Sequence, residues 1–352
     1  MRNKRLLGLG AGLLLVGGFV LKTLADAGQF KHLSPHFAGH CVPVAGMPGG
    51  EDITFHPTTG EAYVSSDDRR ATQAGHPVPG GIYRFDPTGA SPPTLLTGTF
   101  SADFHPHGLS LYVAPDGTQT LFVINHPSTG GAQVERFQVS AEGALVHTRT
   151  VRDPALVSPN DLVAVDAERF YVTNDHHFPP GSLQVVEDYL QLARGNVVYF
   201  DGKGFHEALT GMAFANGINC SADGKTVYLA QSVAQSLSVY TRDVDTGALH
   251  LRHTLPLGTG ADNIERDATG ALWIAAHPKL LDFASYAADV TETRRAPTQV
   301  LRLTPSGDTF QVEEVYLDDG SHISAAATAA VSGKQLLLGP VFAKNLLSCV
   351  LP

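Results

Sequence analysis

The chain has 352 residues, of which 43% are hydrophobic, so it can bury a substantial core, and its length alone allows two domains. Only 16% of the residues are charged, whereas glycine (36) and proline (22) are abundant, as suits many short strands joined by turns. The net charge is −10 and no long basic run occurs, which argues against nucleic acid as a partner.

The N-terminus combines a basic start with an apolar run. Three basic residues precede Leu6–Leu21, which carries no charge, and this pattern is typical of an export signal or a signal anchor. The tripeptide at 25–27 offers a cleavage site of the small-x-small kind, but the apolar run is short for a membrane span, so both fates stay open. We predict that residues 1–27 are a signal peptide or signal anchor and that 28–352 form one exported domain, secreted or periplasmic, with or without a membrane anchor.

A unit recurs six times after residue 50. Each copy has an acidic, amide or His residue, then a short apolar strand, a turn, and an aromatic or β-branched strand that ends in small polar residues. The copies start near residues 52, 108, 161, 217, 263 and, more weakly, 324. A four-stranded propeller blade takes roughly 40–50 residues. The repeat therefore predicts an all-β, six-bladed β-propeller with a central channel, and ordinary hairpins in a sandwich are the alternative.

Polar residues stand at the start of each unit. In a propeller the innermost strand of each blade lines the channel, so these residues should surround one mouth of it. For a single Asn or Asp, turn capping is the better explanation, whereas matched positions in several repeats favour a shared site. The residues at these starts are Glu51, Asp52, His107, Asn160, Asp161, Asn216, Asp262 and Asn263.

The oxygen-rich set favours calcium. Ca²⁺ takes six to eight oxygen ligands from carboxylates, amides and carbonyls, and zinc prefers His and Cys. Asp52 and Asp161 should point away from their neighbours by strand alternation. They would hold a second, deeper cation with a backbone carbonyl, or form a hydrogen-bonded plug of the channel. The candidate ligands of the first cation are Glu51, Asn160, Asn216, Asp262 and Asn263.

Two histidines in the second unit are candidates for proton transfer. His107 stands at an inner-strand start and His126 at a strand end, and a His pair near a cation can act as base and relay because its pKa lies near working pH. Asp175 and His176 form an acid–His pair at the matching place in the third unit. A purely structural role is an equal alternative for each His.

The sequence has no His-Glu-x-x-His, Cys-x-x-Cys, Gly-x-Ser-x-Gly or phosphate-loop motif. The absence of the Gly-x-Ser-x-Gly motif argues against a serine hydrolase.

Three segments interrupt the repeat. Residues 67–81 are predicted to be a long loop at the channel mouth. The segment 178–192 contains a helix-like stretch from Val185 to Leu192 that could cover the mouth, and 282–297 is predicted to be a polar insertion.

Of the three cysteines, Cys41 precedes the first unit and Cys349 lies near the end, so they could close the ring with a disulfide. Three reduced core cysteines are the alternative.

Several long motifs carry a family resemblance. They are Glu51-Asp52, Phe104–Gly108, Asn125–Pro127, Pro159–Val165, Thr173–His176, Phe214–Asn219, Asp262–Ile264 and Ala276–Pro278. On these motifs, which span nearly the whole chain from about Cys41 to Cys349, the sequence resembles the calcium-dependent paraoxonase/arylesterase family. The resemblance departs from the family pattern in residues 67–81, in 279–295 and at Ala276, where the family has a cysteine. Substrate choice is therefore the least transferable property.

The resemblance implies a six-bladed propeller with two Ca²⁺ ions. The catalytic-calcium motif falls on the five oxygen donors above, and the structural-calcium motif on Asp52, Asp161 and the carbonyl of Leu109. The His dyad falls on His107 and His126, and the ring-closing disulfide on Cys41 and Cys349. His277, with Asp175 and His176, is a candidate for a supporting role. The family also implies that residues 1–21 are an uncleaved segment that associates with membrane or lipid.

We therefore expect an exported carboxylic-ester hydrolase acting on lactones and aryl esters. Calcium would polarise the ester carbonyl, and the His dyad would activate water; Glu51 or Asp262 is an alternative base or nucleophile. Turnover of phosphotriesters stays open. Two other interpretations are a sugar-lactone hydrolase with a related propeller and a calcium-stabilised propeller that binds without turnover.

Overall fold

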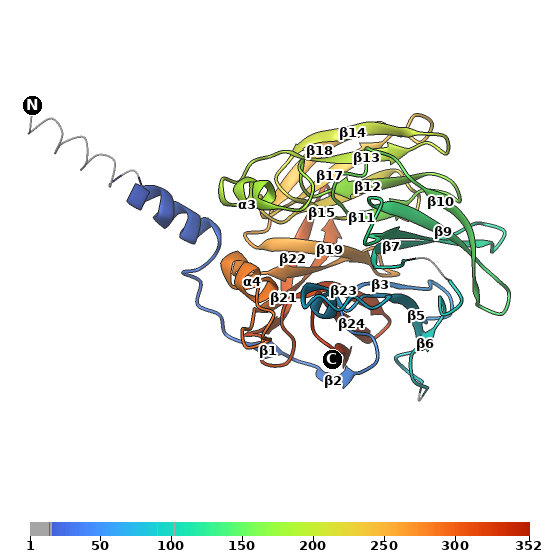
Figure 1. The fold of residues 1–352 in the computed structure, drawn as a ribbon, viewed down its shortest axis with the longest axis horizontal. Coiled ribbons are helices and arrows are strands. Elements are labelled where there is room, and N and C mark those ends of the chain that lie inside the picture. Colours follow the sequence, from blue (N-terminus) through green and yellow to red (C-terminus); the bar gives the residue numbers. More distant parts are fainter. Residues whose placement is uncertain (1–13, 15, 90, 101–102) are drawn as a thin grey trace, which may run out of the picture.

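The computed structural model describes residues 14, 16–89, 91–100 and 103–352. Six antiparallel sheets are arranged around one axis, which confirms the predicted six-bladed propeller (Figure 1). The first four blades are each continuous in sequence. They consist of β3 (Gly50–Phe55), β4 (Ala62–Ser66), β5 (Gly81–Phe85) and β6 (Thr94–Leu95); β7 (Pro106–Val113), β8 (Gln119–Asn125), β9 (Gln133–Val139) and β10 (Leu145–Val151); β11 (Pro159–Ala164), β12 (Phe170–Asn174), β13 (Gly195–Phe200) and β14 (Phe205–Met212); and β15 (Ala215–Cys220), β16 (Thr226–Gln231), β17 (Ser236–Arg242) and β18 (Leu249–Pro256).

The last two blades take strands from both ends of the chain. The fifth contains β19 (Gly260–Arg266), β20 (Leu272–His277), β21 (Thr298–Ser306), β22 (Thr309–Asp318) and the short β1 (His36–Phe37). The sixth contains β23 (Ala326–Ser332), β24 (Gln335–Pro340), β25 (Leu346–Val350) and β2 (His40–Val44). Because β2 pairs with β25 with Cys41 opposite Cys349, the ring closes there, and the structure confirms the disulfide between these two residues. Cys220 is free and half-buried.

The hydrophobic core lies between the blades. Each neighbouring pair of blades has its own cluster of buried apolar side chains, such as Phe122, Phe170 and Phe200 between the second and third blades. Burying one such side chain fully contributes roughly 1.5–3 kcal/mol. The apolar residues of every repeat therefore hold each blade against its neighbours. The first strands of the six blades contact one another in a closed ring.

A β-bulge stands at the start of every innermost strand. The register shifts after Gly50, Pro106, Pro159, Ala215 and Ala261, and again after Ala326 in the sixth blade. A bulge bends the strand and changes the direction of the side chains beside it. The bulges therefore fall at the polar positions that begin each repeat, and they set where those side chains point.

Helices α3 (Ser182–Tyr189) and α4 (Leu280–Ala287) lie on one side of the propeller (Figure 1), and the short helix α2 (Arg69–Gln73) contacts the end of α4 through Arg70. Helix α3 confirms a helix in this segment, but it begins at Ser182 and ends at Tyr189, whereas the predicted stretch ran from Val185 to Leu192. The loop predicted over 67–81 contains α2, whose first turn is capped by Asp68. The prediction of a polar insertion over 282–297 is wrong in its first part, because α4 is rich in apolar side chains.

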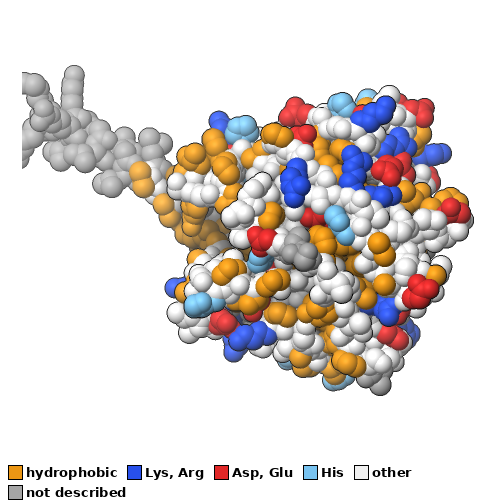
Figure 2. Space-filling model, turned by 45° about the vertical axis from the view of Figure 1, so that its right-hand side comes forward, with side chains coloured by type: hydrophobic (Ala, Val, Ile, Leu, Met, Phe, Trp, Pro, Cys, Tyr) orange, Lys and Arg blue, Asp and Glu red, His pale blue; other side chains and the backbone are white. Residues whose placement is uncertain are grey.

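The N-terminal segment joins the propeller on the side of α3 and α4 (Figure 1). Residues 16–26 are helical, whereas 1–13 and 15, which carry most of the predicted leader, lie outside the described residues. In the described part of the chain, no helix is long and apolar enough to cross a membrane. Charges of both signs are interspersed on the surface shown in Figure 2, and apolar side chains gather where the N-terminal segment meets the propeller.

Candidate active site at the channel mouth

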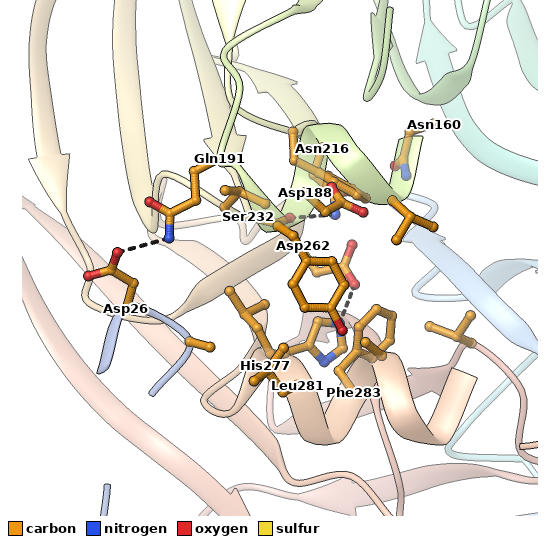
Figure 3. Close-up of a pocket in the computed structure, with 18 of the residues that line it drawn as sticks. Asp26, Asn160, Asp188, Gln191, Asn216, Ser232, Asp262, His277, Leu281 and Phe283 are labelled. Carbon is orange, nitrogen blue, oxygen red and sulfur yellow. Dashed lines mark hydrogen bonds and ion pairs between the residues drawn. The ribbon is translucent and has the colours of Figure 1, made fainter. Parts of the chain in front are cut away.

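A pocket of about 410 Å³ opens on the side covered by α3 and α4. Its floor is formed by residues at the starts of five inner strands, and its walls come from α3, α4 and the end of the N-terminal helix (Figure 3). The structure thus brings together side chains that are far apart in sequence, as the repeat predicted. The floor residues are Glu51, His107, Asn160, Asn216 and Asp262.

Two amide side chains of the floor and that of Asn263, the neighbour of Asp262, are held by their nitrogens, and their oxygens have no hydrogen-bond partner. Asn216 Nδ2 donates to Ser232 Oγ at 2.9 Å, Asn263 Nδ2 to Glu51 Oε1 at 3.0 Å, and Asn160 Nδ2 to an Asp175 carboxylate oxygen at 3.4 Å. The Oδ1 atoms of all three residues, and Glu51 Oε2, are buried without a partner. An unsatisfied buried polar atom costs about 1–3 kcal/mol. Four of them at one place fit the requirements of a hard cation that binds oxygen.

Asp262 completes the predicted calcium set. Its Oδ2 lies 2.7 Å from Nε2 of His277, whose ring stacks on Phe283 with centroids 4.0 Å apart (Figure 3). His277 therefore holds one oxygen of Asp262 from below. Within the described ranges, no three His, Cys, Asp or Glu side chains are placed to hold a metal together. The candidate set contains only two such residues, so its remaining ligands would be amide oxygens.

The carboxylates near the channel axis are buried. Burial raises the pKa of Asp262, which contact with His277 offsets only in part. Burial alone would also raise the pKa of Glu51, but the nearby charges of His107 and Arg69 and the bond from Asn263 hold it below its usual value. A cation at the floor would relieve the repulsion between these two groups.

Each carboxylate oxygen of the deeper acidic pair, Asp52 and Asp161, accepts a hydrogen bond from a backbone amide. Asp52 accepts from the amides of Ile53 and Leu109 at 2.8 and 2.7 Å, and Asp161 from those of Leu162 and Ile218, both at 2.7 Å. Burial raises the pKa of both carboxyl groups well above the usual value, and the nearby charge of Glu51 adds to the effect at Asp52, as does that of Asp52 at Asp161. The carbonyl of Leu109 stays a predicted ligand, because the contact that the structure describes is made by its amide.

The two histidines of the second blade are in contact. His107 Nδ1 lies 3.1 Å from His126 Nε2, and His107 Nε2 lies 3.5 Å from Glu51 Oε2. Burial, together with the charges of His107 and Arg69, lowers the pKa of His126 to about 3, so this ring is neutral at ordinary pH. His107 thus lines the pocket, and the half-buried His126, just after the end of β8, contacts it from outside the lining.

Asp175 and His176 lie behind the floor and connect it to α3. Asp175 accepts from the amide of Asn160 and from Ser158, and its Oδ1 is 2.8 Å from Nδ1 of His176. The other ring nitrogen lies 3.1 Å from Asp188 of α3. These two carboxylates outweigh burial and raise the pKa of His176 to about 10. His176 is thus a cation that ties the helix to the third blade.

Several pocket residues were not predicted individually from the sequence, although segments 67–81 and 178–192 were expected near the channel mouth. The walls include Val185 and Tyr189 of α3, Leu280 and Phe283 of α4, and Phe214, which has a φ of 60° just before β15. The end of the N-terminal helix contributes Thr23, Asp26 and Ala27, and α2 contributes Arg69. Except for Phe214, these residues lie outside the repeat, so no periodic signal marks them.

Comparisons with known proteins agree with this architecture. The sequence model of a family described as Arylesterase matches residues 77–351. Serum paraoxonase/arylesterase 1 of Homo sapiens is 33% identical over 350 residues, with 96% of each chain covered, and serum paraoxonase/arylesterase 2 of Gallus gallus is 33% identical over 326 residues, with 90% of each covered. Serum paraoxonase/lactonase 3 of Oryctolagus cuniculus is 32% identical, with 97% of this chain and 98% of the relative covered.

Solved structures share the fold at much lower identity. A luciferin-regenerating enzyme matches with a TM-score of 0.55 and 12% identity over 89% of this chain and 95% of its own. A gluconolactonase from Xanthomonas campestris matches with a TM-score of 0.52 and 16% identity over 92% and 99%. At these identities the likeness establishes the propeller and nothing further about chemistry.

Proposed function

Because the chain belongs to the arylesterase family and is an ester-hydrolysing enzyme, we propose that it acts on lactones and aryl esters in the pocket at the channel mouth, with bound calcium. The observation that carries the calcium proposal is the set of four buried oxygens, on residues at the starts of four inner strands, that have no hydrogen-bond partners. Glu51, Asn160, Asn216, Asp262 and Asn263 would hold the catalytic ion. A second ion would be held by Asp52, Asp161 and the carbonyl of Leu109.

The floor residues would position the substrate and the attacking water. When bound, calcium would polarise the ester carbonyl and stabilise the negative charge that develops on its oxygen. His107 would accept a proton from the attacking water at Nε2, because its Nδ1 is engaged by His126. We propose that His126 serves as the relay partner of that base by accepting a hydrogen bond from Nδ1 of His107, which fixes the ring and tautomer of His107.

The walls favour apolar substrates over sugars. Leu280 and Phe283 of α4, Val185 of α3 and Phe214 surround the space above the floor, and apolar walls with few polar groups suit alkyl or aryl chains. This feature counts against the sugar-lactone alternative. The relatives are named as serum enzymes, which supports the proposal that this chain is exported.

The substrate proposal is tested with a panel of esters. Purified protein is assayed with γ- and δ-lactones of increasing alkyl length, with gluconolactone and with phenyl acetate. We expect turnover of phenyl acetate and of the alkyl lactones, with kcat/KM rising with chain length and gluconolactone the poorest substrate. Gluconolactone as the best substrate would favour the sugar-lactone alternative, and no turnover of any member would favour a binding propeller.

A further inference from the structure

Arg69 places a positive charge in the pocket. It is the only lysine or arginine that lines the pocket among the residues the structure describes. Its Nη1 donates to the carbonyls of Gly49 at 3.1 Å and Val341 at 3.3 Å, and its Nη2 donates to Pro106 at 3.4 Å. These contacts hold the guanidinium between the first, second and sixth blades, beside the floor.

The guanidinium has unused donors. Nε and one proton of Nη2 have no acceptor in the described part of the chain. These two donors match the two oxygens of a carboxylate. In addition, no carboxylate lies within 4.0 Å of the guanidinium nitrogens in the ranges described. Arg69 is therefore half-buried without a counter-ion.

The neighbouring Arg70 shows the difference between a structural and an available arginine. Arg70 is buried, donates to the carbonyls of Tyr286 and Ala287 at the end of α4, and lies 4.2 Å from the ring centroid of Phe342. It thereby anchors α4. Helix α2 thus uses Arg70 to hold a wall of the pocket, whereas the preceding residue, Arg69, lines the pocket itself.

No carboxylate of the described pocket lining forms an ion pair with Arg69. Asp26 pairs with Lys22, and Asp188 shares His176 with Asp175. The charge of Arg69 helps to lower the pKa of Glu51, but Glu51 and Asp262 would be balanced by the divalent ion proposed for the floor. A carboxylate that approached the guanidinium would be attracted to it in a pocket with apolar walls, where the attraction is weakly screened.

We propose that Arg69 binds a carboxylate group of the substrate, so that this enzyme prefers esters and lactones that carry a negative charge near the reacting carbonyl. The inference rests on the proposed ester hydrolysis and specifies its substrate class. The alternative is that Arg69 only joins three blades through their carbonyls, in which case its loss would lower stability without changing selectivity.

The first test compares two substrates of nearly equal shape. The monophenyl ester of glutaric acid carries a carboxylate, and the corresponding primary amide is neutral. We expect Arg69→Met to lower kcat/KM about ten- to a hundredfold for the carboxylate, and to change it far less for the amide. Arg69→Lys should retain part of the preference. Arg152→Met, which removes an exposed arginine outside the pocket, should leave both values unchanged.

The second test measures binding without turnover. Isothermal titration calorimetry of 4-phenylbutyrate and of 4-phenylbutanamide, with wild type and Arg69→Met, should show a carboxylate preference that the substitution removes. Equal losses for both ligands, or none, would overturn the inference and leave the purely structural role. Retained Arg69-dependent binding in a protein that hydrolyses no ester would contradict the proposed function and still support the anion site.

Discussion

Single side chains supply the oxygens of the proposed cation site. Asn160, Asn216 and Asn263 each donate an amide proton to the protein, and this leaves the opposite amide oxygen of each without a hydrogen-bond partner. An aspartate in place of any of these asparagines would add a negative charge to a region where burial already raises the pKa of Asp262 and disfavours its charged form. The three amides thus supply oxygen donors without adding repulsion.

His107 is the residue whose role is easiest to test. If it accepts the proton of the attacking water, His107→Gln should lower kcat for phenyl acetate and δ-lactones about 10²–10⁴-fold, with calcium content unchanged. His126→Gln should have a smaller effect, since His126 acts through the orientation of His107. A His107→Gln variant with full lactonase activity would remove the dyad from the mechanism and leave Glu51 or Asp262 as the base or nucleophile.

At this scale, prediction from sequence worked where residues occupy matched positions in the repeat. Asn160, Asn216 and Asp262 recur at the same point of successive units, so their convergence follows from the fold. Arg69 lies in an inserted segment with no counterpart in the other blades. Its position depends on α2 and on three carbonyls from separate blades, and no local pattern records those contacts.

Helix α3 depends on a charged histidine. The pKa of His176 is raised from 6.5 to about 10 by Asp175 and Asp188, against the opposing effect of burial. A raised folded-state pKa stabilises the folded protein fully below the unfolded value near 6.5, and this contribution is lost as the pH rises through about 10. The contact between α3 and the third blade should therefore weaken in alkaline solution.

We expect His176→Gln to lower the thermal unfolding midpoint by about 2–4 °C at pH 6. The gap to wild type should shrink as the pH approaches 10. His206→Gln is a suitable control, because His206 is exposed and pairs with Asp201 on the outer strand β14. A gap that stays constant between pH 6 and 10 would contradict the charged state of His176.

The end of the N-terminal helix is a wall of the pocket. Gln191 Nε2 donates to Asp26 Oδ2 at 2.9 Å, and the amide of Leu280 donates to the carbonyl of Ala27 at 2.9 Å. Ala27 is only 6% exposed. A chain cut after residue 27 would therefore lose part of the pocket as well as the predicted leader.

Removing residues 1–27 should raise KM several-fold for long-chain lactones, because Leu280 and Tyr189 would be exposed on the open side. The KM for phenyl acetate should change little, since the floor residues alone can hold that small substrate. A protein that lacks only residues 1–21 keeps Thr23, Asp26 and Ala27 and serves as the control. If the two truncated proteins had equal KM values for lactones of every alkyl length, residues 23–27 would not form a wall of the pocket.

Elements outside the repeat were predicted less well than the blades. Helix α3 was visible in the sequence, whereas α4 was not, because its apolar residues Leu280, Leu281 and Phe283 are followed by a polar stretch that dominates 282–297. The apolar side of α4 is explained by the pocket it covers. That reason becomes visible only when the helix is placed over the channel mouth.

The whole molecule is closed by a contact between its two ends. Strand β2 follows the N-terminal segment and pairs with the last strand, and the disulfide joins residues 308 positions apart. In the chain-entropy model, a cross-link over so long a loop stabilises by roughly 5 kcal/mol. The six-bladed ring and its closure were predictable because every blade buries the same kind of apolar face against the next.

Replacing both Cys41 and Cys349 by Ala should lower the free energy of unfolding in urea by up to about 5 kcal/mol. The denaturation midpoint should fall while the ester hydrolysis of the folded protein is retained. Cys220→Ala is the control, since that thiol is free. A double variant with the midpoint of wild type would show that strand pairing alone closes the ring.

The dependence of hydrolysis on calcium tests the central claim most directly. Purified protein is assayed with phenyl acetate before EDTA, after EDTA and after calcium is restored, and bound calcium is measured in parallel for wild type and Asn216→Ala. We expect activity to disappear with the chelator and return with calcium, about two ions per wild-type chain, and the loss of one ion together with activity in Asn216→Ala. Full activity in protein shown to be free of calcium would contradict the account.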